Sequence, residues 1–304
     1  MPTYPAAPPS LTGDTLSISR FLQNPAQIQR RLRTFRELRF ISDQLLTQRF
    51  RSQGGAVLYE QSESQLTNRD VEQVAPGSAY PYADTGTSTA AIAAIQKWGQ
   101  KVLLTEEEIL RNVYAGAAVD RKLRKVVNTI IKQIDGVTMS AISSAVTQTS
   151  GVVQAWNGAA PQFLRDILLA KAVVVGQNQG YMPDTLAIND AQYAYMMSDD
   201  KVTNARQRET RDNPIYSGEV EVVAGLVIVV SPSITTPIVL DSTQLGGMAD
   251  ETDAMPGYAV SDLAVQVKAI AHEDSDSWDL QGRRKTVPVV QEPGAAVEIT
   301  GTVI

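Results

Sequence analysis

The feature that most constrains this chain is a long stretch, residues 52–91, in which neither helical nor strand periodicity can be followed. A structureless loop of that length is improbable inside a compact domain. Two interpretations are open: the stretch is disordered, or it is an extended excursion that leaves as a strand at Ala56–Glu60 and returns as a strand at Ile95–Leu104. The β-prone ends flank turn-forming Gly and Pro residues, which favours the excursion. A hairpin this long needs another surface on which to lie.

The charge distribution divides the chain into an arm and a body. Residues 1–51 contain eight arginines, no lysine and three acidic residues, so this segment carries a net charge of +5. The whole chain carries −6, which leaves −11 on the remainder. The arm is rich in proline and poor in large apolar residues, so it has little to bury against its own body. We expect it to become ordered on a neighbour; the acidic body argues against a protein that mainly coats duplex DNA.

Within the arm, apolar residues recur every three or four positions from Pro25 to Phe50, which predicts a surface or interface helix. Arginines lie between these apolar residues. The candidate contact residues, predicted to touch a neighbouring subunit or nucleic acid, are Arg30, Arg31, Arg33, Arg36 and Arg39. A solvated helix face is the alternative interpretation of the same residues.

A second, longer helix is predicted to begin after Thr105. The sequence Thr105–Glu108 is typical of a capping box, because the threonine hydroxyl can accept a backbone N–H while acidic residues lie at the positive end of the helix dipole. Apolar residues then keep helical spacing over 119–141, with basic residues between them. If the helix is uninterrupted to Ser144 it is roughly 60 Å long at 1.5 Å per residue. Gly116 and Gly136 are the candidate breaks.

Downstream of Gly158 the patterns alternate between helix and strand. They predict a helix with Pro161 in its first turn that ends around Gly176, a strand at Thr185–Ile188, a helix capped by Asn189 or Asp190, and a polar loop at Arg206–Asn213. A strong strand is predicted over Glu219–Val230, bent at Gly225, followed by short strands at Ile238–Asp241 and Tyr258–Val260 around a Gly246-Gly247 loop. Extended structure is predicted over Trp278–Thr286 and Pro288–Val303. The chain is expected to end inside a strand. Residues predicted to lie in the core include Trp98, Trp278, Tyr193, Tyr195, Met196 and Met197.

Composition excludes several classes of protein. The chain has no cysteine and one histidine, which excludes disulfide frameworks, cysteine nucleophiles and cysteine-ligated metal centres. The longest apolar run, Val222–Val230, is about half of what a membrane-spanning helix needs. Residues 1–10 have no basic residue and no apolar stretch, so they do not predict a secretory signal. We expect synthesis inside the cell and no contact with a membrane.

No catalytic or cofactor-binding constellation is evident, and we expect no cofactor, no metal and no enzymatic activity. Ser198 and Lys201 have the Ser-x-x-Lys spacing of penicillin-binding enzymes, but two intervening acids would raise the pKa of the lysine rather than lower it. A helix end is the simpler interpretation, and a serine hydrolase using this pair is the alternative from another class. His272 is followed by adjacent acids that lack the separation of a closed metal site, so it is predicted to lie in a solvated loop.

The order of elements resembles a known family. The stretches that carry the resemblance are Lys97–Glu107 entering the long helix, Asn189–Tyr193, Val223–Pro232 and Val289–Gly301. In their order and spacing they resemble the major capsid proteins of tailed bacteriophages with the Hong Kong 97 type fold, particularly those of phages infecting actinobacteria. The resemblance spans nearly the whole chain.

The resemblance implies an α+β fold of the Hong Kong 97 type. Its parts would be a basic N-terminal arm at 1–51, an extended β-hairpin loop (E-loop) at 52–104, a peripheral domain with the long spine helix at 105–150, an axial domain at 151–260, and a return to the peripheral domain with terminal β-strands at 261–304. The implied function is that of a major capsid protein, a structural subunit that self-assembles as hexamers and pentamers into an icosahedral head.

The resemblance also implies partners. These are further copies of the chain, a scaffold, a portal and a maturation protease during assembly, packaged double-stranded DNA inside, and an outer decoration protein as a further candidate. The expected location is the virion capsid, assembled in the cytoplasm of the bacterial host. Some members of the family crosslink through a lysine in the extended loop, but there is no lysine before Lys97, so this loop is predicted to form no isopeptide bond. The alternative with the same fold is an encapsulin-type nanocompartment, whose shells usually lack the long basic arm.

Overall fold

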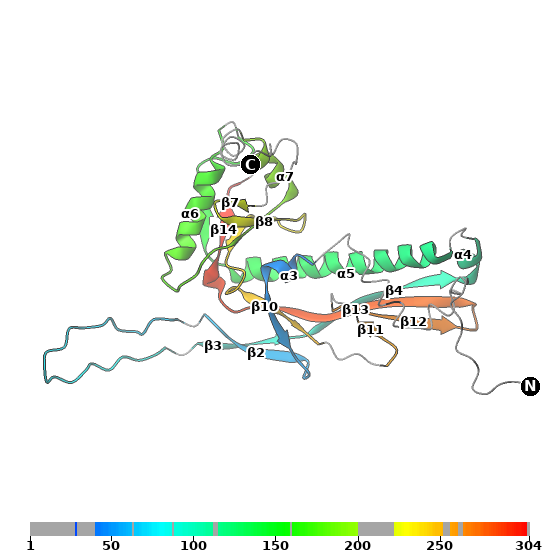
Figure 1. The fold of residues 1–304 in the computed structure, drawn as a ribbon, viewed down its shortest axis with the longest axis horizontal. Helices are drawn as coiled ribbons and strands as arrows, with labels where there is room; N and C mark the ends of the chain where they lie inside the picture. The colour runs from blue at the N-terminus through cyan, green and yellow to red at the C-terminus, as the bar shows by residue number, and fades with distance from the viewer. Residues whose placement is uncertain are drawn as a thin grey trace, which may run out of the picture. The chain divides into compact units, whose positions relative to one another are not determined.

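The computed structural model describes residues 28, 40–62, 64–86, 88–111, 115–158, 160–199, 222–251, 256–260 and 264–302 of the chain (Figure 1). The chain divides into two compact units, each assembled from separate stretches of sequence. Unit 1 takes residues 1–37, 99–128 and 254–283, and unit 2 takes residues 38–98, 129–253 and 284–304.

Unit 1 is built on antiparallel strands. β12 (Gln266–His272) pairs with the first half of β13 (Ser277–Val290), and β11 (Ala259–Val260) pairs with β12. β4 (Gln96–Thr105) also pairs with β13 and leads into the short helix α4 (Glu106–Arg111). The Thr105 hydroxyl accepts the Glu108 backbone N–H at 3.4 Å, which confirms the predicted helix start.

The predicted long helix is present as α5 (Ala115–Ala145), which has 31 residues and is about 46 Å long. Its apolar stripe is buried and includes Val119, Leu123, Val126, Ile130 and Ile134, as the spacing predicted. Both candidate breaks, Gly116 and Gly136, lie inside this helix and do not end it. Residues 112–114, between α4 and α5, lie outside the described ranges.

Unit 2 contains a mixed sheet with the strand order β5-β14-β9-β6-β8-β7. The strands are β5 (Thr149–Gly151), β6 (Thr185–Ile188), β7 (Val222–Val223), β8 (Leu226–Val230), β9 (Ile238–Leu240) and β14 (Ala296–Thr300). β14 follows a single 3₁₀ turn, η1 (Pro293–Ala295). β14 ends at Thr300, and Gly301 and Thr302 are not in a strand, so the predicted extended structure stops short of Val303 among the described residues. The last two residues, where the chain was expected to end inside a strand, lie outside the described ranges.

Two helices accompany this sheet, α6 (Phe163–Val175) and α7 (Asp190–Met197). Asn189, one of the two predicted caps, caps α7, and the structure shows a complete capping box with Gln192. The core buries Phe163, Ile167 and Met196, with Tyr193 and Met197 packed against its edge. Tyr195, in contrast, is exposed.

The tryptophans correct one prediction about the core. Trp98 and Trp278 are only half-buried, whereas Trp156 is fully buried in unit 2. The Trp156 indole N–H donates to the buried Asp166 carboxylate at 3.1 Å, and its ring lies 5.0 Å from that of Phe163. A buried indole needs such an acceptor, so the anchor of this core is a tryptophan with a specific polar partner.

The Gly246-Gly247 pair was predicted to be a loop and is instead the start of the buried strand β10 (Gly246–Asp250). β10 lies between two backbones, β13 on one side and β1 (Gln48–Arg51) on the other. A Cβ on Gly247 would lie 2.3 Å from the Gln48 carbonyl oxygen, and one on Gly246 would lie 2.1 Å from the Val289 carbonyl oxygen. The glycines are needed for close approach rather than for a turn.

Two further predictions are wrong in part. The helix predicted from Pro25 to Phe50 cannot reach its end, because α3 (Ser42–Leu45) stops early and residues 48–51 form β1, paired in parallel with β10. The strand that pairs with β2 (Ala56–Gln61) is β3 (Thr89–Ala94), not the stretch from Ile95 onward, which forms β4 and pairs with β13. The predicted hairpin bend is confirmed at Gly225, which has φ +77°.

Candidate assembly surfaces

The base of the N-terminal arm, residues 40–51, is fixed onto unit 2. Phe40, Leu45 and Leu46 are buried, and β1 extends the sheet by pairing in parallel with β10, from Gln48 opposite Gly247 to Arg51 opposite Asp250. An edge strand is added to a sheet through its main-chain hydrogen bonds, so the attachment depends little on the exposed side chains of β1. The arm therefore leaves the body from a defined point.

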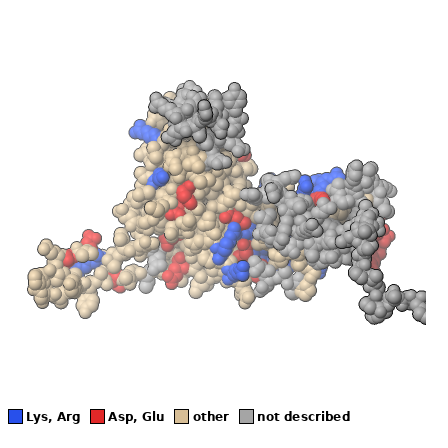
Figure 2. All heavy atoms as spheres, in the orientation of Figure 1, with Lys and Arg blue, Asp and Glu red and all other residues tan. Residues whose placement is uncertain are grey.

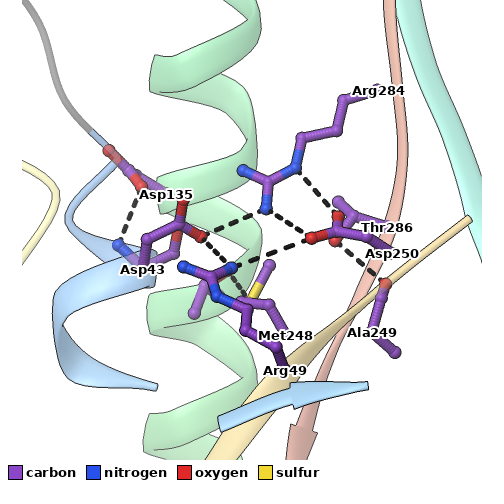
Figure 3. A network of polar contacts seen from close by, with 10 residues as sticks. Asp43, Arg49, Asp135, Met248, Ala249, Asp250, Arg284 and Thr286 are labelled. Atoms are coloured by element: carbon purple, nitrogen blue, oxygen red, sulfur yellow. Dashed lines mark hydrogen bonds and ion pairs between the residues drawn. The ribbon is translucent and has the colours of Figure 1, made fainter. Parts of the chain in front are cut away.

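A buried cluster of charges lies under this attachment (Figure 3). Arg284 on β13 is completely buried, and its Nε and Nη2 donate to the two carboxylate oxygens of Asp250 on β10 at 3.0 and 3.1 Å. The same Nη2 donates to Asp43 on α3 at 3.1 Å, and the guanidinium lies 4.2 Å from the ring centre of Phe40. One side chain thus joins the arm to two strands.

Two further residues complete this cluster. Arg49 on β1 donates to Asp43 at 2.8 Å and lies 3.7 Å from Asp250. On the other side of α3, the backbone N–H of Ser42 donates to Asp135 of α5 at 3.1 Å. We call Asp43, Arg49, Asp135, Asp250 and Arg284 together the arm-base network.

Electrostatics in the arm-base network are set by burial and by pairing. Burial alone would lower the pKa of Arg284, but hydrogen bonds and charges from Asp250 and Asp43 outweigh it and raise this pKa above its usual value. Burial raises the pKa of Asp135 above its ordinary range, although the N–H of Ser42 works in the opposite direction. The pairing of Arg284 is bidentate, the geometry that makes such contacts strong and directional.

The second assembly surface is the hairpin that begins with β2 and β3. The two strands pair antiparallel from Ala56 opposite Ala94 to Gln61 opposite Thr89, and among the described residues no further strand lies beside them. The chain between them runs out and back as an open hairpin (Figure 1). A backbone hydrogen bond from Asn68 to Asp84 at 3.2 Å joins its two limbs.

One face of this two-stranded ribbon is exposed and largely apolar. We call it the exposed ribbon face; its members are Ala56, Leu58, Glu60, Ala90, Ile92 and Ala94. Leu58 and Ile92 lie directly opposite each other and are 70% and 73% exposed. The opposite face, with Val57, Tyr59, Ala91 and Ala93, is partly covered. Large cross-strand apolar pairs are usually buried, so this pair indicates a surface that another molecule covers.

The outer part of the hairpin, residues 64–86, also presents apolar side chains, with Val71 and Tyr82 almost completely exposed. In Figure 2 the hairpin is mostly uncharged, with a few charged side chains near its far end. Arg69 and Glu72 form an ion pair of 2.7 Å within this segment. Near its base, the hairpin is held to unit 2 by the N–H of Gln65, which donates to the Gln179 side chain at 2.8 Å.

The predicted contact arginines cannot be placed on these surfaces. Arg30, Arg31, Arg33, Arg36 and Arg39 lie outside the described residues, so their assignment as contacts of a neighbour or of DNA stays a prediction. The predicted loop at Arg206–Asn213 lies outside them as well.

The structure also places the residues considered for catalysis. Ser198 ends α7, and its hydroxyl donates to the Tyr195 carbonyl at 2.7 Å, as expected of a helix end; Lys201 is not among the described residues. His272 is not in a solvated loop but at the end of β12, with Nε2 3.0 Å from Asp279, which also binds Lys101 at 2.7 Å. The contact with Lys101, and then that with His272, lowers the pKa of Asp279.

Within the described ranges, no group of three or more His, Asp or Glu side chains could hold a metal ion. In the same part of the chain, no helix has the length and apolarity to cross a bilayer.

Sequence reasoning missed the arm-base network. Arg284 falls within the run Arg283-Arg284-Lys285, which by itself is typical of a solvated strand. The available signal was Asp43, one of only three acids in the basic arm, which could have suggested a partner for a buried cation. The strand that carries Asp250 was not predicted, because its two glycines indicated a loop.

Comparisons with known proteins show which family and which fold this chain has. Residues 88–299, more than half of the chain, match the family described as phage capsid protein. No curated protein matches the sequence. Among solved structures, the capsid of the cyanophage P-SCSP1u is 14% identical, with 96% of this chain and 92% of that chain covered and a TM-score of 0.63.

Two other solved structures are comparable. A chain of Microbacterium phage Oxtober96 is 12% identical, with 94% of this chain and 99% of that chain covered and a TM-score of 0.60. A chain of the virus-like particle from Pyrococcus furiosus is 15% identical, with 86% and 92% covered and a TM-score of 0.55. At these identities the likeness concerns the fold, and it confirms the Hong Kong 97-like α+β architecture expected from the sequence. With the family match, it follows that this chain belongs to the phage capsid protein family and is a major capsid protein, a structural component of the phage capsid.

Proposed function

We propose that the chain self-assembles as hexamers and pentamers into an icosahedral shell that encloses double-stranded DNA in the cytoplasm of a bacterial host. Scaffold, portal and maturation protease are the proposed partners during assembly, and the role of the chain is structural rather than catalytic. The extended loop at 52–104 would lie over a neighbouring subunit. The spine-helix region at 105–150 and the return at 261–304 would form the peripheral domain, and 151–260 the axial domain.

The observation that carries this proposal is the exposed ribbon face. Leu58 and Ile92 oppose each other on a ribbon that one copy of the chain leaves uncovered. Burying a large aliphatic side chain contributes about 2 kcal/mol. A subunit that keeps such surface outside its own core gains this contribution only when it packs against another molecule. In a shell of identical subunits, each hairpin would find that surface on the next copy.

The charge distribution supports exchange between copies. The arm carries +5 and the remainder of the chain −11, so arm and body of different subunits attract each other. Arg30, Arg31, Arg33, Arg36 and Arg39 are the proposed contacts of the arm with a neighbour or with packaged DNA. An acidic body also suits an inner wall that must not hold DNA tightly.

The test is negative-stain electron microscopy with size-exclusion chromatography of the protein, expressed alone and then with its genomic neighbours. Closed shells or six- and five-fold rings are the expected result. A compact monomer at high protein concentration under both conditions would contradict the proposal. Nuclease-protected DNA in shells made with the packaging proteins distinguishes a genome container from a cargo-holding compartment, which would form shells without it.

A further inference from the structure

A polar groove of about 350 Å³ lies in unit 2, between the C-terminal half of α5 and the loop that follows β8. Its walls are rich in hydroxyl groups, from Ser140, Ser143 and Ser144 of α5 and from Ser233, Thr235 and Thr236 of the loop. Gly136 and Met139 complete the helical side, and among the described lining residues the ionisable one is Glu298 of β14. The groove shares no residue with the arm-base network or with the exposed ribbon face.

One acceptor oxygen at this groove has no donor among the described residues. Oε1 of Glu298 is buried and has no hydrogen-bond partner. A buried acceptor without a donor costs about 1–3 kcal/mol, and more for a charged group. The Glu298 carboxylate therefore favours a group that brings N–H donors.

The chemistry of the walls favours a guanidinium over other donors. A carboxylate flanked by hydroxyls can accept from a planar fork of N–H groups, and a guanidinium offers five donors in fixed directions. A divalent cation would need further carboxylate or imidazole ligands, and the described residues provide no such group. The chain itself is a source of such donors, because its arm contains eight arginines.

We propose that this groove receives an arginine side chain from the N-terminal arm of a second copy of the chain, with Glu298 as its anionic partner. The inference rests on the proposed assembly into shells, in which each groove is flanked by other copies. It deepens that function by assigning the arm a receptor on the body. The arginine comes from residues 30–39, the segment in which five arginines are concentrated.

The chain has no cysteine, so introduced thiols report this contact without background. Ser140→Cys marks the groove in one population of subunits. Thr34→Cys or Glu37→Cys marks the arm in another and leaves every arginine in place. Shells assembled from a mixture of the two are treated with a short bismaleimide, and products are separated in denaturing gels. In mixed shells, a groove-to-arm crosslink can form only between different copies.

The expected result is a crosslinked dimer of groove-marked and arm-marked subunits, which decreases about tenfold or more when Glu298→Gln is added. Glu107→Gln, at an exposed carboxylate of α4, is the matched control and should leave the yield unchanged. Ser198→Cys in place of Ser140→Cys is the control for position and should give no dimer with either arm variant.

The other outcomes overturn the inference. Shells that form normally but give no such dimer show that the arm does not enter a neighbour's groove, while the proposed function stands. A crosslink found only within a single doubly substituted chain assigns the groove to the chain's own arm. A dimer that persists unchanged in Glu298→Gln means that the carboxylate does not recognise the arm. If the wild-type chain forms no shells, the proposed function fails and this inference fails with it.

Discussion

The base of the arm and the extended hairpin represent opposite solutions to the same problem of attaching a long segment to a body. At the arm base, Arg284 is fully buried and is neutralised by Asp43 and Asp250 within one chain. On the hairpin, Leu58 and Ile92 are large apolar side chains that the chain leaves uncovered. The first region is completed by folding, whereas in the proposed assembly the second would be completed by contact with another molecule.

This difference indicates which interactions define the subunit and which define the assembly. Polar groups buried with defined partners fix one geometry, because any displacement leaves a charge unpaired. Apolar surface on a ribbon tolerates small shifts, since its stabilisation depends on buried area and not on direction. A subunit that must fit several neighbours benefits from a rigid point of departure for the arm and a hairpin that adapts to what it covers.

The largest effect on the stability of the subunit should come from removing the buried cation of Arg284. Arg284→Met should lower the free energy of unfolding of the unassembled subunit by about 3–5 kcal/mol, because Asp43 and Asp250 remain buried without a counter-charge. Urea denaturation followed by circular dichroism measures this change. Arg284→Lys is the control: it keeps the charge but cannot bridge both carboxylates, so its loss should be smaller. A fully stable Arg284→Met subunit would mean that the network does not hold the arm base.

The next largest effect is expected on the hairpin, where a substitution should weaken assembly and leave the stability of the subunit unchanged. Leu58→Asp should change the free energy of unfolding of the unassembled subunit by no more than about 0.5 kcal/mol, because the side chain is exposed there. It should weaken each contact between subunits by about 2 kcal/mol, seen as a higher critical concentration for shell formation. Leu58→Met keeps the apolar contact and should assemble normally. Equal assembly of Leu58→Asp and wild type would show that the exposed ribbon face stays uncovered.

The two regions also differ in how well the sequence predicts them. Elements specified by neighbouring residues were predicted correctly: the outgoing strand near Ala56, the helix start at Asn189 and the apolar stripe of α5. The open hairpin itself followed from turn residues and lost periodicity over 52–91. In each case the signal lies within a short window of sequence, where local propensity and spacing carry the information.

The arm-base network was not predictable in the same way. Arg284 and Asp43 are 241 positions apart, and nothing near either residue indicates the other. The end of the arm has the apolar spacing of a helix, yet residues 48–51 form β1 because β10 offers a free strand edge. Likewise, Gly246 and Gly247 signal a turn locally, whereas the packed backbones on both sides decide their conformation. Tertiary pairing overrides local preference at each of these points.

A smaller effect, on the pH dependence of stability, is expected from Asp135, the acid at the edge of the arm-base network. Because the pKa of Asp135 is raised in the folded state, that state binds more protons than the unfolded state between pH 3.8, the ordinary value, and the raised value. The free energy of unfolding therefore falls as pH rises through this window. At neutral pH it remains lowered by the cost of keeping the buried Asp135 carboxylate ionised.

Asp135→Asn should flatten this pH dependence and leave the subunit at neutral pH as stable as wild type or more stable, by at most about 1 kcal/mol. The amide oxygen can still accept the Ser42 N–H, so α3 keeps its contact with α5. Urea denaturation at a series of pH values measures the slope. Asp190→Asn, at an exposed acid of α7, is the control. An unchanged slope in Asp135→Asn would place the source of the pH dependence elsewhere.

The last prediction concerns a property that the hairpin should lack. Residues 52–96 contain no lysine, so the hairpin cannot supply the amine of an isopeptide bond, and its attachment to a neighbour depends on non-covalent contacts such as those of Leu58 and Ile92. Shells heated in SDS should therefore release monomers, and Leu58→Asp shells, where they form, should dissociate at lower denaturant concentration. A ladder of covalent oligomers would contradict this expectation, and mass spectrometry of the linked peptides would then identify the residues that join the subunits. A monomer band would show that non-covalent contacts hold the shell, and the proposed contacts of the apolar ribbon and of the arm can then be told apart, because the first depends on buried area and the second on salt.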